Sequence, residues 1–454
     1  MRLCIGFLLA AAVASPSAAA GSAVSLHLSD WHLEEPHWEK ALREMMAVFQ
    51  AQNPGISVSF DSVPYAAKEL RYTTEIQSGA GPDLIHLHGF SIRSFIEKGF
   101  LLDITPFIGQ EGKTAWGGSF VDTWYPATTE LMKYRGKYYA LPSDFMSMVL
   151  FYNRTLFADA GLDPDRPPQT WDDFLRDAKA CTRDLNKDGK PDTWGFGTVG
   201  TVDPGFELRF TPFLLSFGAA YLAPDTKRSA LNSPEAKEAF RFYISLVTEH
   251  RVVPPGVTAQ NPNGVRQQMA KAMIAMEIGS GWTLPIISGM NPSLNAAKTI
   301  AAAPIPSRAG RKVDKPTTAW ISAWMINRNT KHPREAWMLL KFLTSKAADE
   351  KWFIDARVLS ARRDVSGGLE EKGIKPFGPL VADPLSRVIA GELPRSQFVP
   401  QIKEWPQIIE IVNRAVQSGF SGARTADQAL KEAYEETNRI LSVYRPAGET
   451  VPDF

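Results

Sequence analysis

The sequence has little cysteine and no excess of charge. Its 454 residues include only Cys4 and Cys181, and Cys4 lies in an N-terminal segment that we expect to be removed, so an intramolecular disulfide is excluded even in an oxidising compartment. Lysine and arginine number 50 against 49 aspartate and glutamate. Without Arg2 the 49 remaining basic residues balance the 49 acidic ones, so nothing indicates nucleic acid or another polyanion as a partner.

Long apolar runs are also missing. The run over residues 3–13 is too short to span a bilayer as a helix, and the small residues that follow, ending Ala18-Ala19-Ala20, are typical of a signal peptide. We expect cleavage after Ala20, with Ala23 as the alternative, and release of a soluble, monomeric protein into the periplasm. Cys4 is not placed at the cleavage site, so no lipid anchor is predicted.

The motifs of several enzyme classes are absent. The sequence contains no H-E-x-x-H, no G-x-S-x-G and no P-loop. Residues 195–200 spell G-x-G-x-x-G, but a polar turn precedes them and no helical pattern begins there. We therefore expect no bound dinucleotide and no other cofactor.

The hydrophobic pattern at the start of the chain predicts an α/β fold. Val24, Leu26 and Leu28 alternate with polar residues, residues 38–49 have helical spacing, and alternation returns at 56–60, which predicts a parallel βαβ unit. A helix over 64–77 and a strand over 83–87 follow. Ligands of such sheets bind beyond the carboxyl ends of the strands, so the loops at 30–35 and 88–91 are the first candidate site.

A second α/β segment begins near residue 141. Thr170 and Asp173 form a capping-box pattern, and the helix that they open has an apolar face that includes Cys181, which we expect to be buried and inert. Further helices are predicted over 233–250, 333–344 and 425–441. The chain shows neither an internal repeat nor a flexible linker between its halves.

Several short segments carry a family resemblance. They are Ser78-Gly79-Ala80-Gly81-Pro82-Asp83-Leu84-Ile85, Gly136-Lys137-Tyr138-Tyr139-Ala140-Leu141-Pro142, Phe151-Tyr152-Asn153, Thr170-Trp171-Asp172-Asp173-Phe174, Asp188-Gly189-Lys190 with Trp194-Gly195-Phe196, and Ala272-Met273-Ile274-Ala275-Met276 leading to Gly281-Trp282. In order and spacing they resemble the family of extracellular solute-binding proteins that contains the maltose-binding and glycerol-3-phosphate-binding proteins of ABC importers. The resemblance covers nearly the whole chain after the signal segment.

The resemblance implies a two-lobed periplasmic-binding-protein fold, in which each lobe is a mixed, largely parallel sheet flanked by helices. It implies three crossings between the lobes, near 141–144, 318–322 and 360–364, a first lobe of residues 24–142 plus 320–362, and a second of 143–319 plus 363–454. Such proteins close like a hinge around a ligand and dock on a membrane permease. The expected function is capture of a mono- or oligosaccharide in the interlobe cleft for an ABC importer.

Sugars offer apolar ring faces and hydroxyl edges, so a receptor needs aromatic planes and fixed hydrogen-bonding groups. Trp31, Trp282 and Trp320 are predicted at the ends of elements that face the cleft, whereas Trp38, Trp171, Trp337 and Trp352 sit in helical patterns typical of core. The resemblance implies that Trp282 stacks on the sugar. Tyr65 is a candidate wall or the apolar start of its helix.

The polar candidates lie in the loops and crossings. Asp144 could accept hydrogen bonds from two sugar hydroxyls or cap a hinge loop, and His88 could donate to the ligand or simply be solvated. Asp30, Glu34 and Glu35 share the first loop, and we expect one of these three to face the cleft. The resemblance adds Phe206 and Arg209 in the second lobe, and Ser322 beyond Trp320 completes the set.

Metal binding has two weak sequence signals. Residues 184–192 match the start of a calcium loop through Asp184, Asn186, Asp188 and Asp192, but Gly195 stands where the bidentate glutamate would be, and such residues also form tight turns. His86 and His88 lie two apart on one strand, without a third ligand nearby in sequence. We therefore predict no metal site.

Two rival functions use the same residues. A receptor for a glycerol phosphodiester or another anion would need a cation in the cleft, for which Arg209, Arg357 or Arg362 would serve. A secreted glycan-cleaving enzyme would need a carboxylate pair, for which Asp30 and Asp144 are available. The family resemblance argues against the enzyme, so we expect a binding protein.

Overall fold

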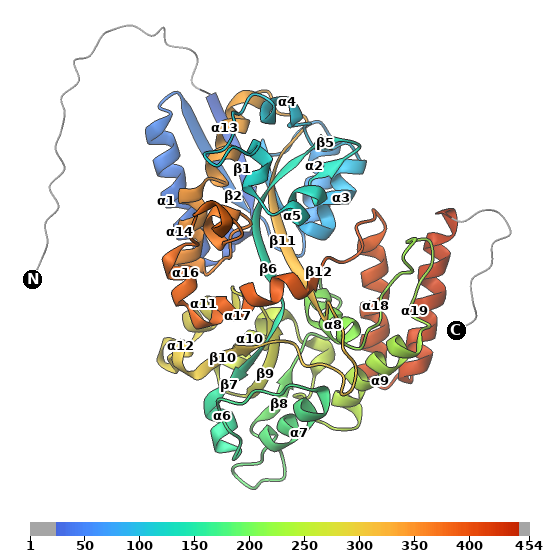
Figure 1. Cartoon of the computed structure of the whole chain (residues 1–454). Helices are drawn as coiled ribbons and strands as arrows, with labels where there is room; N and C mark the ends of the chain where they lie inside the picture. The colour runs from blue at the N-terminus through green and yellow to red at the C-terminus, as the bar shows by residue number, and fades with distance from the viewer. Residues whose placement is uncertain (1–23, 445–454) are drawn as a thin grey trace, which may run out of the picture.

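The computed structural model describes residues 24–444, so the predicted signal peptide, with Cys4 and the cleavage site near Ala20, lies outside the described residues. The described chain forms two α/β lobes, one above the other in Figure 1. We call the six-stranded sheet and its helices the first lobe, and the four-stranded sheet and its helices the second lobe.

The first sheet grows from the predicted βαβ unit. β1 (Val24–Asp30) pairs in parallel with β2 (Ile56–Ser62) and β3 (Leu84–His88). The order then continues to β11 (Thr317–Ile326), which is antiparallel to β3 and to β6 (Ala140–Ser147) and parallel to the short β12 (Ser396–Gln397). The predicted mixture of parallel and antiparallel pairing is confirmed.

Helices cover this sheet. α1 and α13 pack on β1, β2 and β11, and α3 packs on β3 and β11. The helices in this part of the chain are α1 (Pro36–Gln52), α2 (Lys68–Gln77), α3 (Gly89–Glu97), α4 (Thr105–Ile108), α5 (Pro126–Leu131), α13 (Pro333–Leu343), α14 (Lys346–Ala356), α15 (Arg363–Ser366) and α16 (Gly378–Ala382), with a hairpin of β4 (Lys133–Tyr134) and β5 (Lys137–Tyr138). α2 begins four residues later than the expected start at Pro64, because residues 64–67 form a turn in which the Ala67 amide donates to the Pro64 carbonyl.

The second sheet has the order β10 (Ile300–Ala303), β7 (Val149–Asn153), β9 (Ile274–Gly279) and β8 (Trp194–Gly197). Only β8 and β9 are parallel, so the sheet is mixed as predicted but mostly antiparallel instead of largely parallel. Its helices are α6 (Arg154–Asp159), α7 (Trp171–Cys181), α8 (Gly205–Ser216), α9 (Pro234–Thr248), α10 (Pro262–Ala270), α11 (Thr283–Met290) and α12 (Ala296–Thr299), followed near the C-terminus by α17 (Pro384–Glu392), α18 (Trp405–Phe420) and α19 (Ala426–Leu441). The capping box of Thr170 and Asp173 forms as predicted. Cys181 is buried, and burial raises the pKa of its thiol to about 12.

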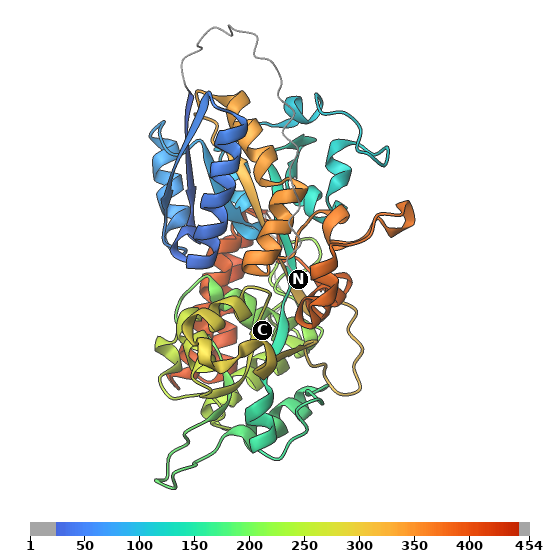
Figure 2. The same ribbon diagram turned by 90° about the vertical axis from the view of Figure 1, so that its left-hand side faces the viewer.

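Two antiparallel strands, β6 and β11, join the lobes. β6 ends in the first sheet at Ser147 and β7 begins in the second at Val149. Between them the Met148 amide donates to the Thr318 carbonyl at 3.0 Å, and the Thr317 hydroxyl donates to the Met148 carbonyl at 2.7 Å. β6 and β11 therefore run side by side toward the second lobe, which both views show (Figure 1 and Figure 2). The residue boundaries of the lobes given above stay a prediction.

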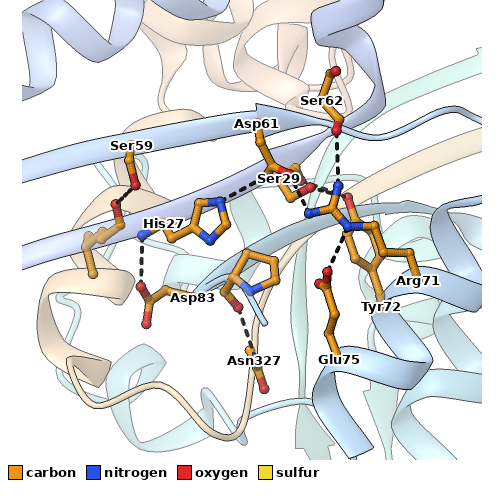
Figure 3. A network of polar contacts seen from close by, with 12 residues as sticks. His27, Ser29, Ser59, Asp61, Ser62, Arg71, Tyr72, Glu75, Asp83 and Asn327 are labelled. Atoms are coloured by element: carbon orange, nitrogen blue, oxygen red, sulfur yellow. Dashed lines mark hydrogen bonds and ion pairs between the residues drawn. The ribbon is translucent and has the colours of Figure 1, made fainter. Parts of the chain in front are cut away.

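A polar network fixes α2 against the edge of the first sheet (Figure 3). The Arg71 guanidinium bonds Asp61 and donates to the Glu75 carboxylate at 2.8 Å. The Tyr72 hydroxyl donates to the Ser29 carbonyl at 3.0 Å, and His27 contacts Asp61 at 2.8 Å. Because these contacts join β1, β2 and α2, they set the position of the first turn of α2 beside the end of β1.

Candidate ligand-binding site between the lobes

The end of β1 carries a buried carboxylate. The Asp30 side chain accepts from the His32 amide at 3.2 Å and contacts Nδ1 of His32 at 3.0 Å and Nδ1 of His86 at 3.2 Å. Burial alone would raise the pKa of Asp30, but the charge and hydrogen bonding of the two histidines outweigh burial and hold that pKa well below its usual range. Asp30 therefore orients His32 and His86 instead of pointing at a ligand by itself.

Aromatic rings stack in layers over this carboxylate. The His86 ring lies parallel to Trp31, with centroids 4.5 Å apart, and to Trp324, at 4.0 Å. The His32 ring stacks on Trp38 at 3.8 Å. Burial lowers the pKa of His86 to about 4, so the ring is neutral near pH 7. The stack gives Trp31 a fixed plane at the carboxyl end of β1.

A second aromatic contact joins the lobes. The His88 ring stacks on Trp320 at 5.1 Å, and Trp320 meets the edge of Trp282 at 5.4 Å. Trp320 belongs to β11 of the first lobe, and Trp282 precedes α11 of the second. Three predicted site residues therefore come together, and their contact joins the two lobes.

A buried lysine, which the sequence reasoning missed, completes the first-lobe side. Nζ of Lys68 lies 3.5 Å from the ring centroid of Tyr65 and 5.2 Å from that of Trp31, and it donates to the Tyr65 carbonyl at 2.8 Å. It also pairs with Glu69 at 3.2 Å. Burial lowers the pKa of Lys68 to about 8. No sequence signal marks this residue, because lysine at the start of a helix is ordinarily exposed.

Asp144 and Ser322 face each other across β6 and β11. Oδ1 of Asp144 accepts from the Ser322 amide at 2.7 Å, beside a register shift between Ser322 and Ala323. The Trp320 indole donates to the Ser322 hydroxyl at 3.0 Å. Burial raises the pKa of Asp144 to about 6. The carboxylate thus satisfies an amide at an irregular point of the crossing strands, which agrees with the capping alternative.

The second-lobe side is formed by α8, β9 and the start of α11. Phe206 is fully buried and stacks on Phe210 at 5.3 Å, so it supports α8 from within the lobe. Arg209 is 2 % exposed and donates through Nη1 to the Gly205 carbonyl at 3.0 Å. Glu277, which the sequence reasoning missed, is fully buried on β9. A glutamate inside the apolar run of that strand was the available signal.

Charged groups of the second lobe act on the pKa of a side chain in the first lobe. Burial is the main cause of the raised pKa of Tyr65 in the first lobe, and the charges of Asp203, Glu207 and Arg209 in the second lobe also act on it. Burial lowers the pKa of Arg209 to about 10 and raises that of Glu277, which Arg209 and Arg266 oppose. We call the following set the interlobe site: Trp31, Tyr65, Lys68, His88 and Trp320 from the first lobe, and Arg209, Glu277, Trp282 and Thr283 from the second.

Among the described residues, one group has the donor set of a metal site. One ligand atom each of Asp30, His32 and His86 lies within 4.8 Å of the others. The fold thus gives His86 the third neighbour that its sequence surroundings lacked. The hydrogen bonds from the two rings to Asp30, and from the Ser143 hydroxyl to Nε2 of His86 at 2.8 Å, account for this geometry without a metal.

The candidate calcium loop is organised by its own backbone. Oxygens of Asp184 accept from the amides of Lys187 at 2.6 Å and Gly189 at 2.8 Å, and Asp192 accepts from the Leu185 amide at 2.7 Å. Asn186 donates to Asp192 at 3.1 Å. These bonds are those of a tight polar turn.

Two α/β lobes with aromatic and charged side chains buried between them define a two-lobed solute-binding protein. The chain belongs to the bacterial extracellular solute-binding protein family, whose model matches residues 35–350.

Three relatives illustrate the match. A Brucella abortus protein described only as a binding protein is 27% identical over 88% of this chain and 89% of its own length. The mannitol-binding protein of Pseudomonas aeruginosa is 24% identical over 88% and 90%. The crystal structure of an ABC transporter solute-binding protein from Thermotoga lettingae, bound with α-D-tagatose, has a TM-score of 0.79 and 28% identity, covering 92% of this chain and 100% of that one.

Proposed function

We propose that this protein is the extracytoplasmic receptor of an ABC importer, which captures a sugar or polyol in the interlobe site and delivers it to a membrane permease. The observation that carries the proposal is the meeting of Trp282 with Trp320 and His88 across the lobes, beside buried polar groups from both sides. Aromatic planes with a few fixed polar groups suit a ligand that has ring faces and hydroxyl edges. The ligands named for the relatives, mannitol and tagatose, support this chemistry.

The proposal includes binding without catalysis. A glycan-cleaving enzyme would need Asp30 and Asp144 as a free carboxylate pair. Instead Asp30 is held by His32 and His86, and Asp144 by the Ser322 amide. Each carboxylate therefore has a structural partner, which supports a receptor.

We also propose export to the periplasm, with cleavage of a signal peptide near Ala20. Membership of an extracellular solute-binding family supports export. Among residues 24–444, no helix has both the length and the apolar composition needed to cross a membrane.

The first experiment is a thermal-shift screen of residues 21–454 against sugars, polyols and phosphodiesters. A ligand at 100 times its dissociation constant adds about 2.7 kcal/mol to the free energy of unfolding, which gives a clear shift. If no compound of these classes shifts the melting temperature of the folded protein, the proposed function is wrong.

Trp282→Ala then tests the site. The variant removes the second-lobe aromatic plane, and we expect affinity for the identified ligand to fall about 100-fold while the melting temperature without ligand changes little, because the Trp282 side chain is only partly buried. Trp282→Phe is the matched control that keeps an aromatic ring and should retain most of the affinity. Calorimetry measures both, and unchanged affinity in the alanine variant would place the ligand elsewhere.

A further inference from the structure

Polar atoms without protein partners gather on the second-lobe side of the interlobe site. Within the described residues, the buried side-chain atoms without a hydrogen-bond partner include both carboxylate oxygens of Glu277, Nε and Nη2 of Arg209, Nε1 of Trp282 and the hydroxyl of Thr283. Buried polar groups in folded proteins are almost always paired, so a cluster of exceptions calls for an outside partner.

These atoms come from three elements that meet at the end of the second sheet. Glu277 lies on β9, two residues before the strand ends, and Thr283 begins α11 after a short turn. A Cβ atom on Gly279 would lie 2.4 Å from the Thr283 hydroxyl, so α11 starts directly over the end of β9. Arg209 reaches this place from α8, where Nη1 is already engaged by the Gly205 carbonyl. Its remaining nitrogens are therefore the available donors.

The chemistry of this cluster distinguishes ligand classes. The Glu277 carboxylate offers only acceptors, so it needs donors such as hydroxyl groups. Arg209 and the Trp282 indole offer only donors, which need oxygen acceptors. A hydroxyl group is both donor and acceptor, whereas a phosphate or carboxylate placed here would meet a buried carboxylate and be repelled.

Of the other arginines considered for an anion, Arg362 is already engaged by protein groups. Nε and Nη2 of Arg362 donate to the two oxygens of Asp364, both at 2.9 Å, and Nη1 donates to the Thr344 carbonyl at 2.9 Å. Arg357 caps the end of α14, and its guanidinium lies 5.2 Å from the ring centroid of Phe353. Arg209 differs from both because its charge interacts with that of Glu277.

We propose that Glu277 and Arg209 select a neutral polyhydroxyl ligand, with two neighbouring hydroxyls donating to Glu277 and a hydroxyl oxygen accepting from Arg209. The inference rests on the proposed function and deepens it, because it excludes phosphodiesters and sugar acids as the preferred cargo. Trp282 Nε1 and the Thr283 hydroxyl supply the remaining hydrogen bonds.

Glu277→Gln tests the inference because it should change affinity in opposite directions for neutral and for anionic ligands. Calorimetry would compare D-mannitol, D-tagatose and further neutral sugars and polyols with glycerophosphocholine, glycerol 3-phosphate and D-gluconate. For a neutral ligand, replacing the carboxylate by an amide removes one hydrogen-bond acceptor. It also removes the negative charge that strengthens the two hydrogen bonds from the ligand hydroxyls, so affinity should fall at least 30-fold. For an anionic ligand the same change removes repulsion, so affinity should rise. The exposed Glu249→Gln is the matched control and should change neither.

Thr283→Val keeps the inference testable if Glu277→Gln does not fold. It preserves shape, removes one unpaired hydroxyl, and should weaken binding of the neutral ligand about tenfold without lowering the melting temperature. If an anion binds more tightly than every neutral compound, or if Glu277→Gln leaves neutral binding unchanged, the inference is wrong while the receptor function stands. If no compound binds the folded protein, the proposed function and the inference both fail.

Discussion

At the scale of single residues, Lys68 is a charged side chain of the site whose burial lowers the stability of the fold. The side chain is 0% exposed, with its ammonium over the Tyr65 ring and near Trp31. Removing an ammonium from water costs free energy that a cation–π contact, one carbonyl and the ion pair with Glu69 recover only in part. Lys68 therefore holds a charge within the interlobe site, and its burial lowers the stability of the fold.

Lys68→Met should raise stability near neutral pH and weaken ligand binding. Burial lowers the pKa of Lys68 from 10.5 to about 8, so the unfolded chain binds more protons between these values and the stability of the wild type rises with pH across that window. The advantage of the variant should therefore be largest below pH 8 and shrink by roughly 3 kcal/mol toward pH 10.5. Melting temperatures of both proteins from pH 7 to 10.5 test this, and a constant difference would contradict it.

The sequence predicts residues of the site unevenly. Trp31, His88, Trp282 and Trp320 could be predicted because they stand at strand ends or in a recognisable segment, and the fold does bring the last three into contact. Lys68 and His86 could not, since their burial depends on which helix and strands enclose them. Their role as ligand contacts stays a prediction for every residue of the interlobe site.

At the scale of elements, α8 is tied to α18 through one buried hydrogen bond. The Trp405 indole donates to Oε2 of Glu207 at 2.8 Å, and both side chains are buried. Burial raises the pKa of Glu207 to about 8, against the opposing effect of the Trp405 bond. The folded protein thus keeps a proton on Glu207 that the unfolded chain has lost by neutral pH.

Glu207→Gln should remove one source of alkaline destabilisation. Because the folded pKa lies above the ordinary value of 4.5, this group contributes stability that is fully present below pH 4.5 and lost as pH rises through 8. The loss is roughly 5 kcal/mol at most. The variant keeps an acceptor for Trp405, so its melting temperature relative to wild type should increase between pH 5 and 8. If the melting temperatures of the two proteins change in parallel between pH 5 and 8, Glu207 is already ionised in the folded wild type across this range.

Elements were predictable where a local pattern decides them. The βαβ unit, the capped helix α7 and helix α19 follow from spacing and capping residues. α2 starts late because a turn at Pro64 replaces its first residues, and the strand expected at 83–87 extends through His88. β11 was foreseen only as a crossing: its mostly apolar sequence gives no clear period, and its length is set by pairing with both β3 and β6.

At the scale of the whole molecule, the resemblance predicts two lobes and a hinge, but not how closely the lobes meet. That depends on side chains far apart in sequence. Gly281 follows β9 in the second lobe, and a Cβ atom there would lie 2.4 Å from the Arg357 carbonyl at the end of α14 and 3.2 Å from the sulfur of Met146 on β6. α14 packs on α1 of the first lobe, so this glycine permits the two lobes to approach.

Gly281→Ala should therefore favour a more open arrangement without unfolding either lobe. A backbone carbonyl cannot give way as a flexible side chain can, so the methyl group must separate the lobes locally. A shift of about 1.4 kcal/mol against the closed form weakens binding about tenfold. Small-angle X-ray scattering with and without saturating ligand should give a larger radius of gyration than wild type in both cases.

Gly289→Ala in α11 is the matched control, because nothing lies within 4 Å of its Cβ position. It should leave the scattering curve and the affinity unchanged, while the small gain expected for alanine over glycine in a helix raises the melting temperature slightly. If Gly281→Ala binds as tightly as wild type and scatters identically, the contact with Arg357 does not limit closure. Variants of Trp282 and Trp320, which also join the lobes, should then alter the closed form instead.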